Sequence, residues 1–246
     1  MKTLAVYNIK GGVGKTASSV NLAYLAAAGG GRVLVWDLDP QGAASFYFRV
    51  KPKVKGGSKG LVKGAQELES VIKSTQYEKL DLLPADFSYR KLDLQLAKTG
   101  KDTRLARILK PARRTYDYVF LDCPPSISPL SESIFRAADA LLVPMLPTTL
   151  SLRSFEQLRS FCEDKASKGL TLLPFFTMVD RRKRMHKDTL VRFPQQSPDC
   201  LPVTIPYSSI VERMGLEQAP LGAFAPGSPA GRAYAALWRA ISARID

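Results

Sequence analysis

The chain has 246 residues, of which 45% are apolar and 24% charged, an ordinary composition for a globular protein with one large domain or two small ones. No run approaches the roughly 18 apolar residues that a membrane-spanning helix needs, and we expect no signal peptide. Lysine and arginine outnumber aspartate and glutamate by 36 to 22, and the net charge of +14 favours a polyanionic partner, either nucleic acid or an anionic membrane surface.

The apolar pattern along the chain predicts strands that alternate with helices. The expected strands are rich in Val, Leu, Phe and Ile without strict polar alternation, which is typical of strands buried on both faces. This order predicts an α/β fold, a mostly parallel twisted sheet with helices on both faces, built as one domain over residues 1–246. Strands are expected at residues 3–8, 32–36, 80–84, 116–121, 140–145, 170–179 and 203–205, and helices at 15–28, 65–73, 88–98, 103–113, 131–138, 150–167, 208–216 and 230–244.

Two basic stretches interrupt this pattern. Residues 51–63, KPKVKGGSKGLVK, are rich in lysine and glycine and are expected to form a mobile loop. Residues 181–187, RRKRMHK, contain five basic residues and the only histidine directly after an expected strand. The three cysteines, Cys123, Cys162 and Cys200, are far apart in the sequence, which fits a reduced cytosolic protein without a zinc or disulfide framework.

Residues 10–16, KGGVGKT, lie at an expected strand-to-helix turn and predict a phosphate-binding loop. Glycines let the backbone point successive N–H groups at one anion, and the start of the following helix adds positive potential. Lys15 is expected to reach the β- and γ-phosphates, and the Thr16 hydroxyl to bind Mg²⁺. The backbone of the loop would complete the nucleotide contacts through Gly11, Gly12, Val13, Gly14 and Ala17.

The loop departs from the G-x-x-x-x-G-K-[ST] pattern, because Ile9 stands where the first glycine is expected and Lys10 follows it. The segment resembles the deviant Walker A motif of the ParA/MinD superfamily, P-loop NTPases with a nitrogenase iron protein-like fold. In that superfamily two ATP-bound subunits face each other, and the leading lysine reaches the partner's phosphates. The resemblance therefore implies a homodimer in the ATP state, with Lys10 acting in trans as an arginine finger does.

Two acidic segments support the resemblance. Residues 36–42, WDLDPQG, are similar to the first switch segment of the superfamily, which implies that Asp39 orients or activates the attacking water. Asp37 is then expected to support the Mg²⁺ ion or the loop. Residues 116–126, YDYVFLDCPPS, have the Walker B arrangement of a buried strand that ends in an acid, and Asp122 is expected to hold Mg²⁺-bound water.

The resemblance extends to the C-terminal part of the chain. In these folds adenine lies between the loops that follow the last strands, which implies Met178, Asp180 and Pro206 as candidates. Tyr207 stands where many members have an arginine after Ile-Pro. Part of the DNA contact usual in the superfamily is therefore in doubt here.

Three functions are compatible with such an ATPase. A ParA-type protein binds nonspecific DNA in its ATP state and positions a plasmid, a chromosome region or a protein cargo. A MinD-type protein instead associates with a membrane through an amphipathic helix. Residues 230–245 do carry an apolar stripe, but packing onto the sheet is its expected role. An iron protein needs an iron–sulfur cluster, for which the three cysteines have no suitable spacing.

The sequence favours the first function, a weak Mg²⁺-dependent ATPase in the cytoplasm that associates with the nucleoid. A ParB-like or cargo-adaptor protein is expected to stimulate hydrolysis, and membrane binding is not expected. Scattered cations give the sequence-independent, salt-sensitive DNA affinity that such a protein needs. The candidate DNA contacts are Arg181, Arg182, Lys183, Arg184, Lys187, Arg213 and Arg232.

Overall fold

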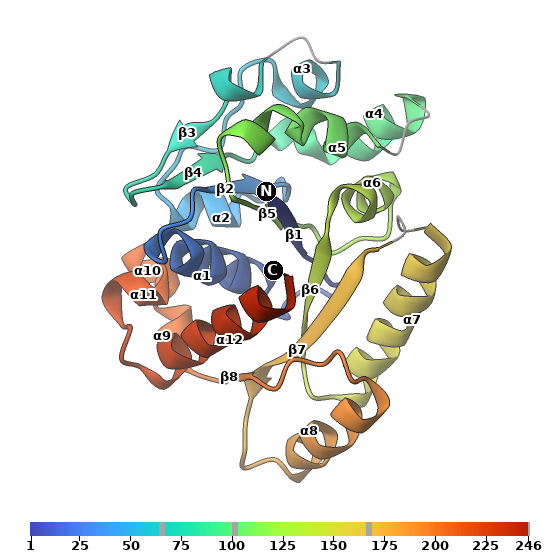
Figure 1. Cartoon of the computed structure of the whole chain (residues 1–246), viewed down its shortest axis with the longest axis vertical. Helices are drawn as coiled ribbons and strands as arrows, with labels where there is room; N and C mark the ends of the chain where they lie inside the picture. Colours follow the sequence, from blue (N-terminus) through green and yellow to red (C-terminus); the bar gives the residue numbers. More distant parts are fainter. Residues whose placement is uncertain (64–66, 100–102, 166–168, 246) are drawn as a thin grey trace.

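One mixed sheet forms the centre of the computed structural model, which describes residues 1–63, 67–99, 103–165 and 169–245 (Figure 1). Within these residues the strand order is β3-β4-β2-β5-β1-β6-β7-β8, and only β3 runs antiparallel to its neighbour. The mostly parallel sheet expected from the sequence is confirmed. The strands are β1 (Lys2–Val6), β2 (Val33–Asp37), β3 (Lys73–Ser74), β4 (Leu80–Leu83), β5 (Tyr118–Asp122), β6 (Ala140–Met145), β7 (Thr171–Val179) and β8 (Thr204–Pro206).

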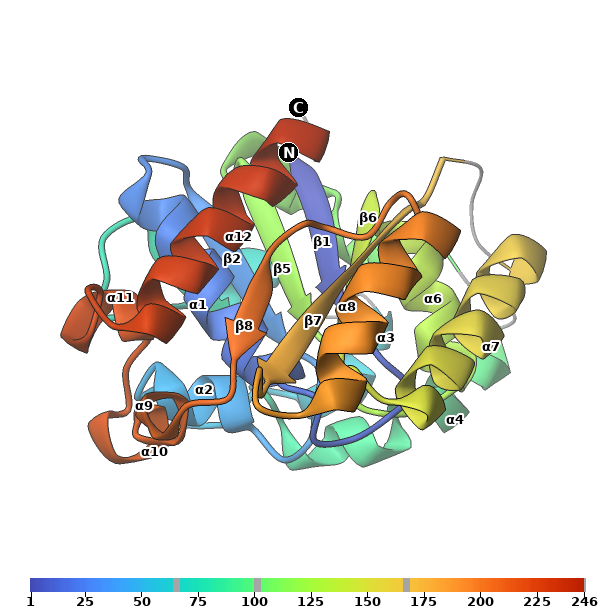
Figure 2. The same ribbon diagram turned by 90° about the horizontal axis from the view of Figure 1, so that it is seen from below.

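Helices cover both faces of the sheet, with α1 and α12 on one side and α6 and α7 on the other (Figure 2). The first face carries α1 (Lys15–Ala28), α2 (Ala43–Tyr47), α9 (Ser209–Glu212), α10 (Met214–Glu217), α11 (Leu221–Phe224) and α12 (Pro229–Ile245). The second face carries α3 (Gly57–Lys63), α4 (Leu92–Thr99), α5 (Arg104–Leu109), α6 (Pro129–Ala137), α7 (Thr149–Lys165) and α8 (Arg184–Gln196). Three 3₁₀ turns, η1 (Leu68–Ser70), η2 (Phe87–Lys91) and η3 (Pro111–Arg114), complete the described elements.

Each face of the sheet has its own hydrophobic core, which explains why the strand sequences lack polar alternation. In β1, Leu4 and Val6 enter the core beneath α1 and α12, while Ala5 belongs to the core on the opposite face. All three side chains have no exposed surface. Because successive strand residues point to opposite faces, a sheet covered on both sides must be apolar at every position.

The apolar stripe of the last helix packs against the sheet, as expected. Tyr234, Leu237 and Ile241 are at most 2% exposed. The Trp238 ring meets Tyr118 edge-on with 5.2 Å between centroids, which joins α12 to β5. The stripe is therefore core, and it leaves no apolar face on α12 for a bilayer. Among the described residues, no helix is both long and apolar enough to cross a membrane.

Several expected boundaries are wrong. In place of the helix expected at 65–73, the structure has the η1 turn followed by β3. The first two residues of that expected helix, and the last two of the helix expected at 150–167, lie outside the described residues. The basic stretch at 51–63 is not a plain loop, since α3 occupies its second half with Leu61 and Val62 buried. Pro111 ends α5 early, because proline lacks the N–H that a continuing helix needs. The helix expected at 208–216 is divided into α9 and α10.

Candidate nucleotide site

The loop between β1 and α1 has the shape of a phosphate cradle. Gly12 and Gly14 have φ angles of +72° and +85°, a region that side chains avoid. A Cβ added at Gly11 or Gly12 would meet no atom within 4 Å, so the space above this part of the loop is open. The Thr177 hydroxyl on β7 lies 2.9 Å from the Val13 carbonyl oxygen and ties the loop to the sheet. The open cradle at the start of α1 fits an anion.

Lys15 and Lys10 are arranged very differently. Lys15 is buried, and its Nζ donates a hydrogen bond of 2.8 Å to the Lys10 carbonyl oxygen. Burial lowers the pKa of Lys15, although the negative charge of Asp122 opposes this effect. The backbone N–H of Lys10 donates to Asn8 Oδ1 at 2.9 Å, which fixes the loop at that point. The Lys10 ammonium has no hydrogen-bond or ion-pair partner among the residues that the structure describes.

Asp37 and Asp122 lie opposite each other at the carboxyl ends of β2 and β5. Both are fully buried, and burial raises the pKa of each, with the charge of Asp37 raising that of Asp122 further. Ser45 donates to Asp37 Oδ2 from its N–H at 2.8 Å and from its hydroxyl at 2.7 Å. The Ser19 hydroxyl donates to Asp122 Oδ1 at 2.9 Å. Neither serine was expected from the sequence to belong to the site. The feature that could have indicated each one is a small polar residue inside an otherwise apolar helix.

This pair of acids fits a hard divalent cation. Asp37 Oδ1 and Asp122 Oδ2 are buried and have no hydrogen-bond partner among the described residues. The Thr16 side chain lies close enough to Asp122 to lower the pKa of that carboxyl, against the effect of burial. No cluster of three or more His, Cys, Asp or Glu that could hold a metal occurs in the described part of the chain. A cation here would therefore need further oxygen ligands, which is how Mg²⁺ binds at nucleotide phosphates.

Asp39 lies in the turn that follows β2. Its Oδ1 accepts the Gln41 N–H at 3.0 Å, and its carbonyl oxygen accepts the Gly42 N–H at 2.9 Å. Gly42 has a φ of +68°, and a Cβ there would lie 3.2 Å from Pro52 Cβ, so both conformation and space require glycine. Residues 39–42 therefore form a tight turn. The role of Asp39 toward water stays a prediction.

The three candidate adenine residues come together at adjacent strand ends. Val179 on β7 pairs with Pro206 on β8, and Val179 lies between Met178 and Asp180. Met178 has a φ of +52°, and its Cε lies 4.0 Å from the position of a Cβ on Gly14, so this residue borders the phosphate loop. The Asp180 carboxylate is occupied by Arg182, whose Nε and Nη2 each donate at 2.9 Å.

The basic residues expected to contact DNA are all exposed. Three of the seven lie beside acids: Arg182 beside Asp180, Arg184 beside Asp188 and Arg213 beside Glu217. His186 is buried and accepts the Asp180 N–H at 3.1 Å, and burial lowers its pKa. This histidine therefore fixes the start of α8. The sequence did not reveal that α8 exists.

The site has the parts of a P-loop nucleotide site: a cradle at the start of α1, two acids at neighbouring strand ends and a lysine without a partner among the described residues. Comparison with known proteins supports this assignment. The model of a family described as an AAA domain matches residues 1–170. The chain is 30% identical to the chromosome-partitioning ATPase Soj of Treponema pallidum, over 99% of this chain and 98% of that one. It is 32% identical to the chromosome partitioning protein ParA of Caulobacter vibrioides, over 75% and 72%. The chain belongs to the ParA/MinD superfamily of P-loop ATPases.

Other matches are partial or concern the fold. The sporulation initiation inhibitor protein Soj of Bacillus subtilis is 35% identical over 64% of this chain, and the match spans 63% of that protein. Cobyrinic acid a,c-diamide synthase from Mycobacterium smegmatis, with a bound ATP analog and magnesium, has a TM-score of 0.82 at 28% identity, covering 98% and 94% of the two chains. McdA from Cyanothece, in complex with ATP, has a TM-score of 0.83 at 24% identity, covering 98% and 96%. One fold thus serves several activities, so function must be argued from the site.

Proposed function

We propose that the chain binds ATP with Mg²⁺ in this cradle, hydrolyses it weakly and forms a homodimer in the ATP state. The observation that carries the proposal is the Lys10 ammonium, which lies at the head of the loop without a partner among the described residues. Lys15 and the loop N–H groups would hold the phosphates, and Thr16, Asp37 and Asp122 would hold the cation. Mg²⁺, when bound, would neutralise phosphate charge, while Asp39 would orient the attacking water.

A rim of exposed apolar side chains supports dimerisation. Six large hydrophobic residues follow the carboxyl ends of six different strands, the edge of the sheet that carries the nucleotide site, and each is between 48% and 67% exposed. Apolar groups gathered around a charged site favour a protein interface over open solvent. A second copy of the chain would cover this rim while its Lys10 reached the phosphates. The rim residues are Phe46, Phe87, Ile127, Leu150, Met185 and Tyr207.

The dimer would bind nonspecific DNA and position a cargo on the nucleoid, in the cytoplasm. The net charge of +14 and the two partitioning relatives support this function. A ParB-like or cargo-adaptor protein would stimulate hydrolysis and so release the dimer. The alternative, a MinD-like membrane ATPase, has no support in α12, because its apolar stripe is buried.

Co-sedimentation with DNA and with anionic vesicles tests this function directly. The protein should sediment with DNA of arbitrary sequence when a slowly hydrolysed ATP analogue is present, and should stay in the supernatant without it. Sedimentation with vesicles but not with DNA would overturn the proposal in favour of the membrane alternative. ADP serves as the nucleotide control, since the dimer needs the γ-phosphate.

A further inference from the structure

Three of the seven cations expected to contact DNA already have a carboxylate partner. Arg182 forms two hydrogen bonds of 2.9 Å with Asp180, Arg213 lies 2.8 Å from Glu217, and Arg184 lies 3.8 Å from Asp188. An arginine that already has a carboxylate partner adds little positive potential for a second anion. Two other stretches of the chain contain several basic residues and no acidic residue.

Residues 51–63 present five lysines and no acidic residue. Their backbone is anchored, since the Val54 N–H donates to Asp86 Oδ2 at 2.9 Å and the Ser58 N–H donates to Ser88 Oγ at 2.8 Å. Val54, Leu61 and Val62 are buried, so the lysines between them face solvent. No lysine of this stretch has an ion-pair partner among the described residues. The exposed lysines are Lys51, Lys53, Lys55, Lys59 and Lys63.

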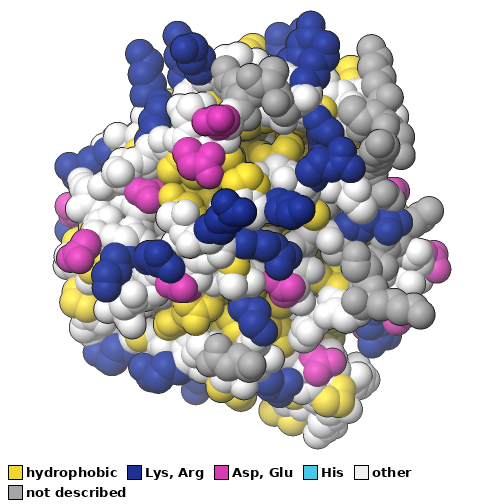
Figure 3. Space-filling model, turned by 45° about the horizontal axis from the view of Figure 1, so that its top comes forward, with side chains coloured by type: hydrophobic (Ala, Val, Ile, Leu, Met, Phe, Trp, Pro, Cys, Tyr) yellow, Lys and Arg dark blue, Asp and Glu magenta, His cyan; other side chains and the backbone are white. Residues whose placement is uncertain are grey.

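Residues 103–114, which form α5 and η3, carry five more basic residues and again no acid. α5 packs against α3, so the two basic stretches are neighbours. We call residues 51–63 and 103–114 together the α3–α5 face. Figure 3, which brings the top of Figure 1 forward, shows many dark blue side chains there around a yellow hollow. The basic residues of the second stretch are Arg104, Arg107, Lys110, Arg113 and Arg114.

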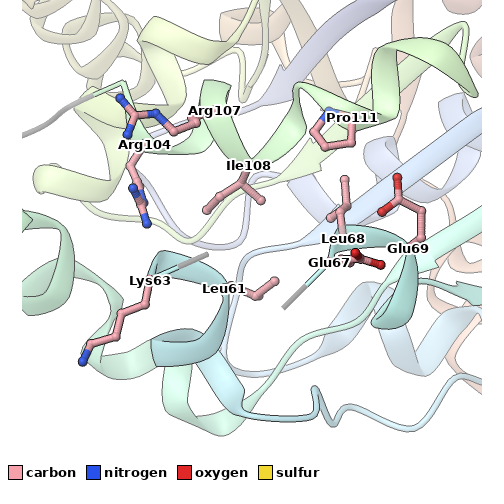
Figure 4. A pocket seen from close by; sticks show the side chains of 9 residues that line it. All are labelled: Leu61, Lys63, Glu67, Leu68, Glu69, Arg104, Arg107, Ile108 and Pro111. Carbon is pink, nitrogen blue, oxygen red and sulfur yellow. The ribbon is translucent and has the colours of Figure 1, made fainter. Parts of the chain in front are cut away.

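The hollow has a volume of about 530 Å³ and divides the charges of this face. Figure 4 shows Lys63, Arg104 and Arg107 on one side and Glu67 and Glu69 on the other, with apolar side chains between them. The Arg104 Nε is buried and has no hydrogen-bond partner among the described residues. An anion is therefore attracted to the cationic side and repelled from the opposite rim. The aliphatic side chains of Leu61 and Leu68 in this hollow do not protrude, since each is 4% exposed.

Crowding like charges costs stability unless an anion is bound. Lys59 and Lys63 are four residues apart on α3, a spacing at which like charges repel. We infer that the α3–α5 face binds the phosphate backbone of nucleic acid and supplies the main cationic contact of the molecule. The inference rests on the proposed DNA binding and assigns it to a surface other than the basic start of α8. Backbone phosphates suit such a surface, because scattered cations replace their counterions without reading bases.

Three matched triple variants test the inference in the presence of a slowly hydrolysed ATP analogue. The first replaces Lys59, Arg107 and Lys110 by glutamine, the second replaces Arg181, Lys183 and Lys187, and the third replaces Arg153, Arg192 and Arg239. Each removes three positive charges from exposed positions, and glutamine preserves helix propensity. DNA affinity is measured over a range of salt concentrations, and ATP binding and thermal unfolding verify that each variant is folded.

The first variant should lower the slope of log affinity against log salt by about 2 to 3 and weaken binding at least about tenfold, while the third leaves the slope close to wild type. An unchanged slope in the first variant, with a reduced slope in the second, would overturn the inference and leave DNA binding intact. Wild-type protein that binds no DNA would overturn the proposed function itself. Anionic vesicles that bind in a Lys59-, Arg107- and Lys110-dependent way, without DNA binding, would show that the face serves a membrane.

Discussion

Asp37 and Asp122 face each other across the β2–β5 pair, and each keeps one buried carboxylate oxygen without a hydrogen-bond partner among the described residues. Two buried acids this close repel each other when both are ionised, so the arrangement is unfavourable without a cation. A proton or a metal ion between the strands therefore stabilises the pair. This condition links nucleotide binding to the stability of the sheet.

The effect of pH on the nucleotide-free protein follows from this pair. The pKa of Asp122 is raised by burial and by Asp37, so the folded state holds a proton that the unfolded state releases near its ordinary pKa. Stability is therefore lost as pH rises above about 4 toward the folded pKa. Asp122→Asn should match wild type at pH 4 and be more stable at pH 8 by at least about 1 kcal/mol.

Denaturant unfolding at several pH values measures this difference without nucleotide or metal. Asp188→Asn, on the exposed surface of α8, is the control, because it removes a carboxylate that is not buried. In the presence of nucleotide, Asp122→Asn should also lose the extra stability that Mg²⁺ gives to wild type. An Asp122→Asn curve parallel to wild type would mean that folding does not raise the pKa of Asp122.

Lys10→Ala should separate ATP binding from dimerisation. The cradle and Lys15 remain in place, so ATP should still bind, while the ATP-dependent dimer disappears and turnover falls by at least about 100-fold. Light scattering with a slowly hydrolysed analogue measures the mass, and Lys15→Ala is the contrasting variant that should lose ATP itself. An ATP-dependent Lys10→Ala dimer would refute the role in trans.

Asp39→Ala should slow hydrolysis and leave ATP binding nearly unchanged. Among the described residues its side chain orders the turn only through the Gln41 N–H, so its loss should perturb the fold little. The variant should accumulate as an ATP dimer on DNA, which is seen as sedimentation that persists after ATP is added. Turnover equal to that of wild type would remove Asp39 from catalysis.

The apolar rim should contribute to the dimer and not to the folding of one copy. Ile127→Ser combined with Leu150→Ser should weaken the ATP-dependent dimer by at least about tenfold, since each side chain loses apolar contact area. Unfolding free energy and ATP binding should stay at wild-type values. Val191→Ser, an equally exposed site on α8, is the control. If Val191→Ser weakens the ATP-dependent dimer as much as the double variant does, the rim is not the dimer interface.

Because the apolar stripe of α12 is buried, substitutions in it should lower the free energy of unfolding and leave membrane binding unchanged. Leu237 has no exposed surface and packs in the core beneath α1, so Leu237→Ala should cost about 2–5 kcal/mol of unfolding free energy. Arg239→Ala, two residues away and exposed, should change stability little. A stable Leu237→Ala protein with altered vesicle binding would contradict the packing.

The sequence by itself determined the features that depend on local backbone chemistry. Glycine at positions 12 and 14, lysine and threonine after them, and an acid at the end of each of two apolar strands predicted the phosphate loop and its acids. Apolar runs without alternation predicted a sheet covered on both faces, and the two cores confirm it. These predictions agree with the structure because each depends on a few residues that are neighbours in the sequence.

Only the tertiary structure decided what pairs across long distances. The register that places Asp37 opposite Asp122, and the serines that hold their other oxygens, depend on strands far apart in the chain. The anchoring of residues 51–63 to Asp86 and Ser88 turned an expected loop into a helix with exposed lysines. Even between residues two positions apart, the turn before α8 sets the Arg182–Asp180 pair, which neutralises a cation that looked free in the sequence. The contribution of a charged side chain to anion binding depends on its ion-pair partners, and folding determines which partners it has.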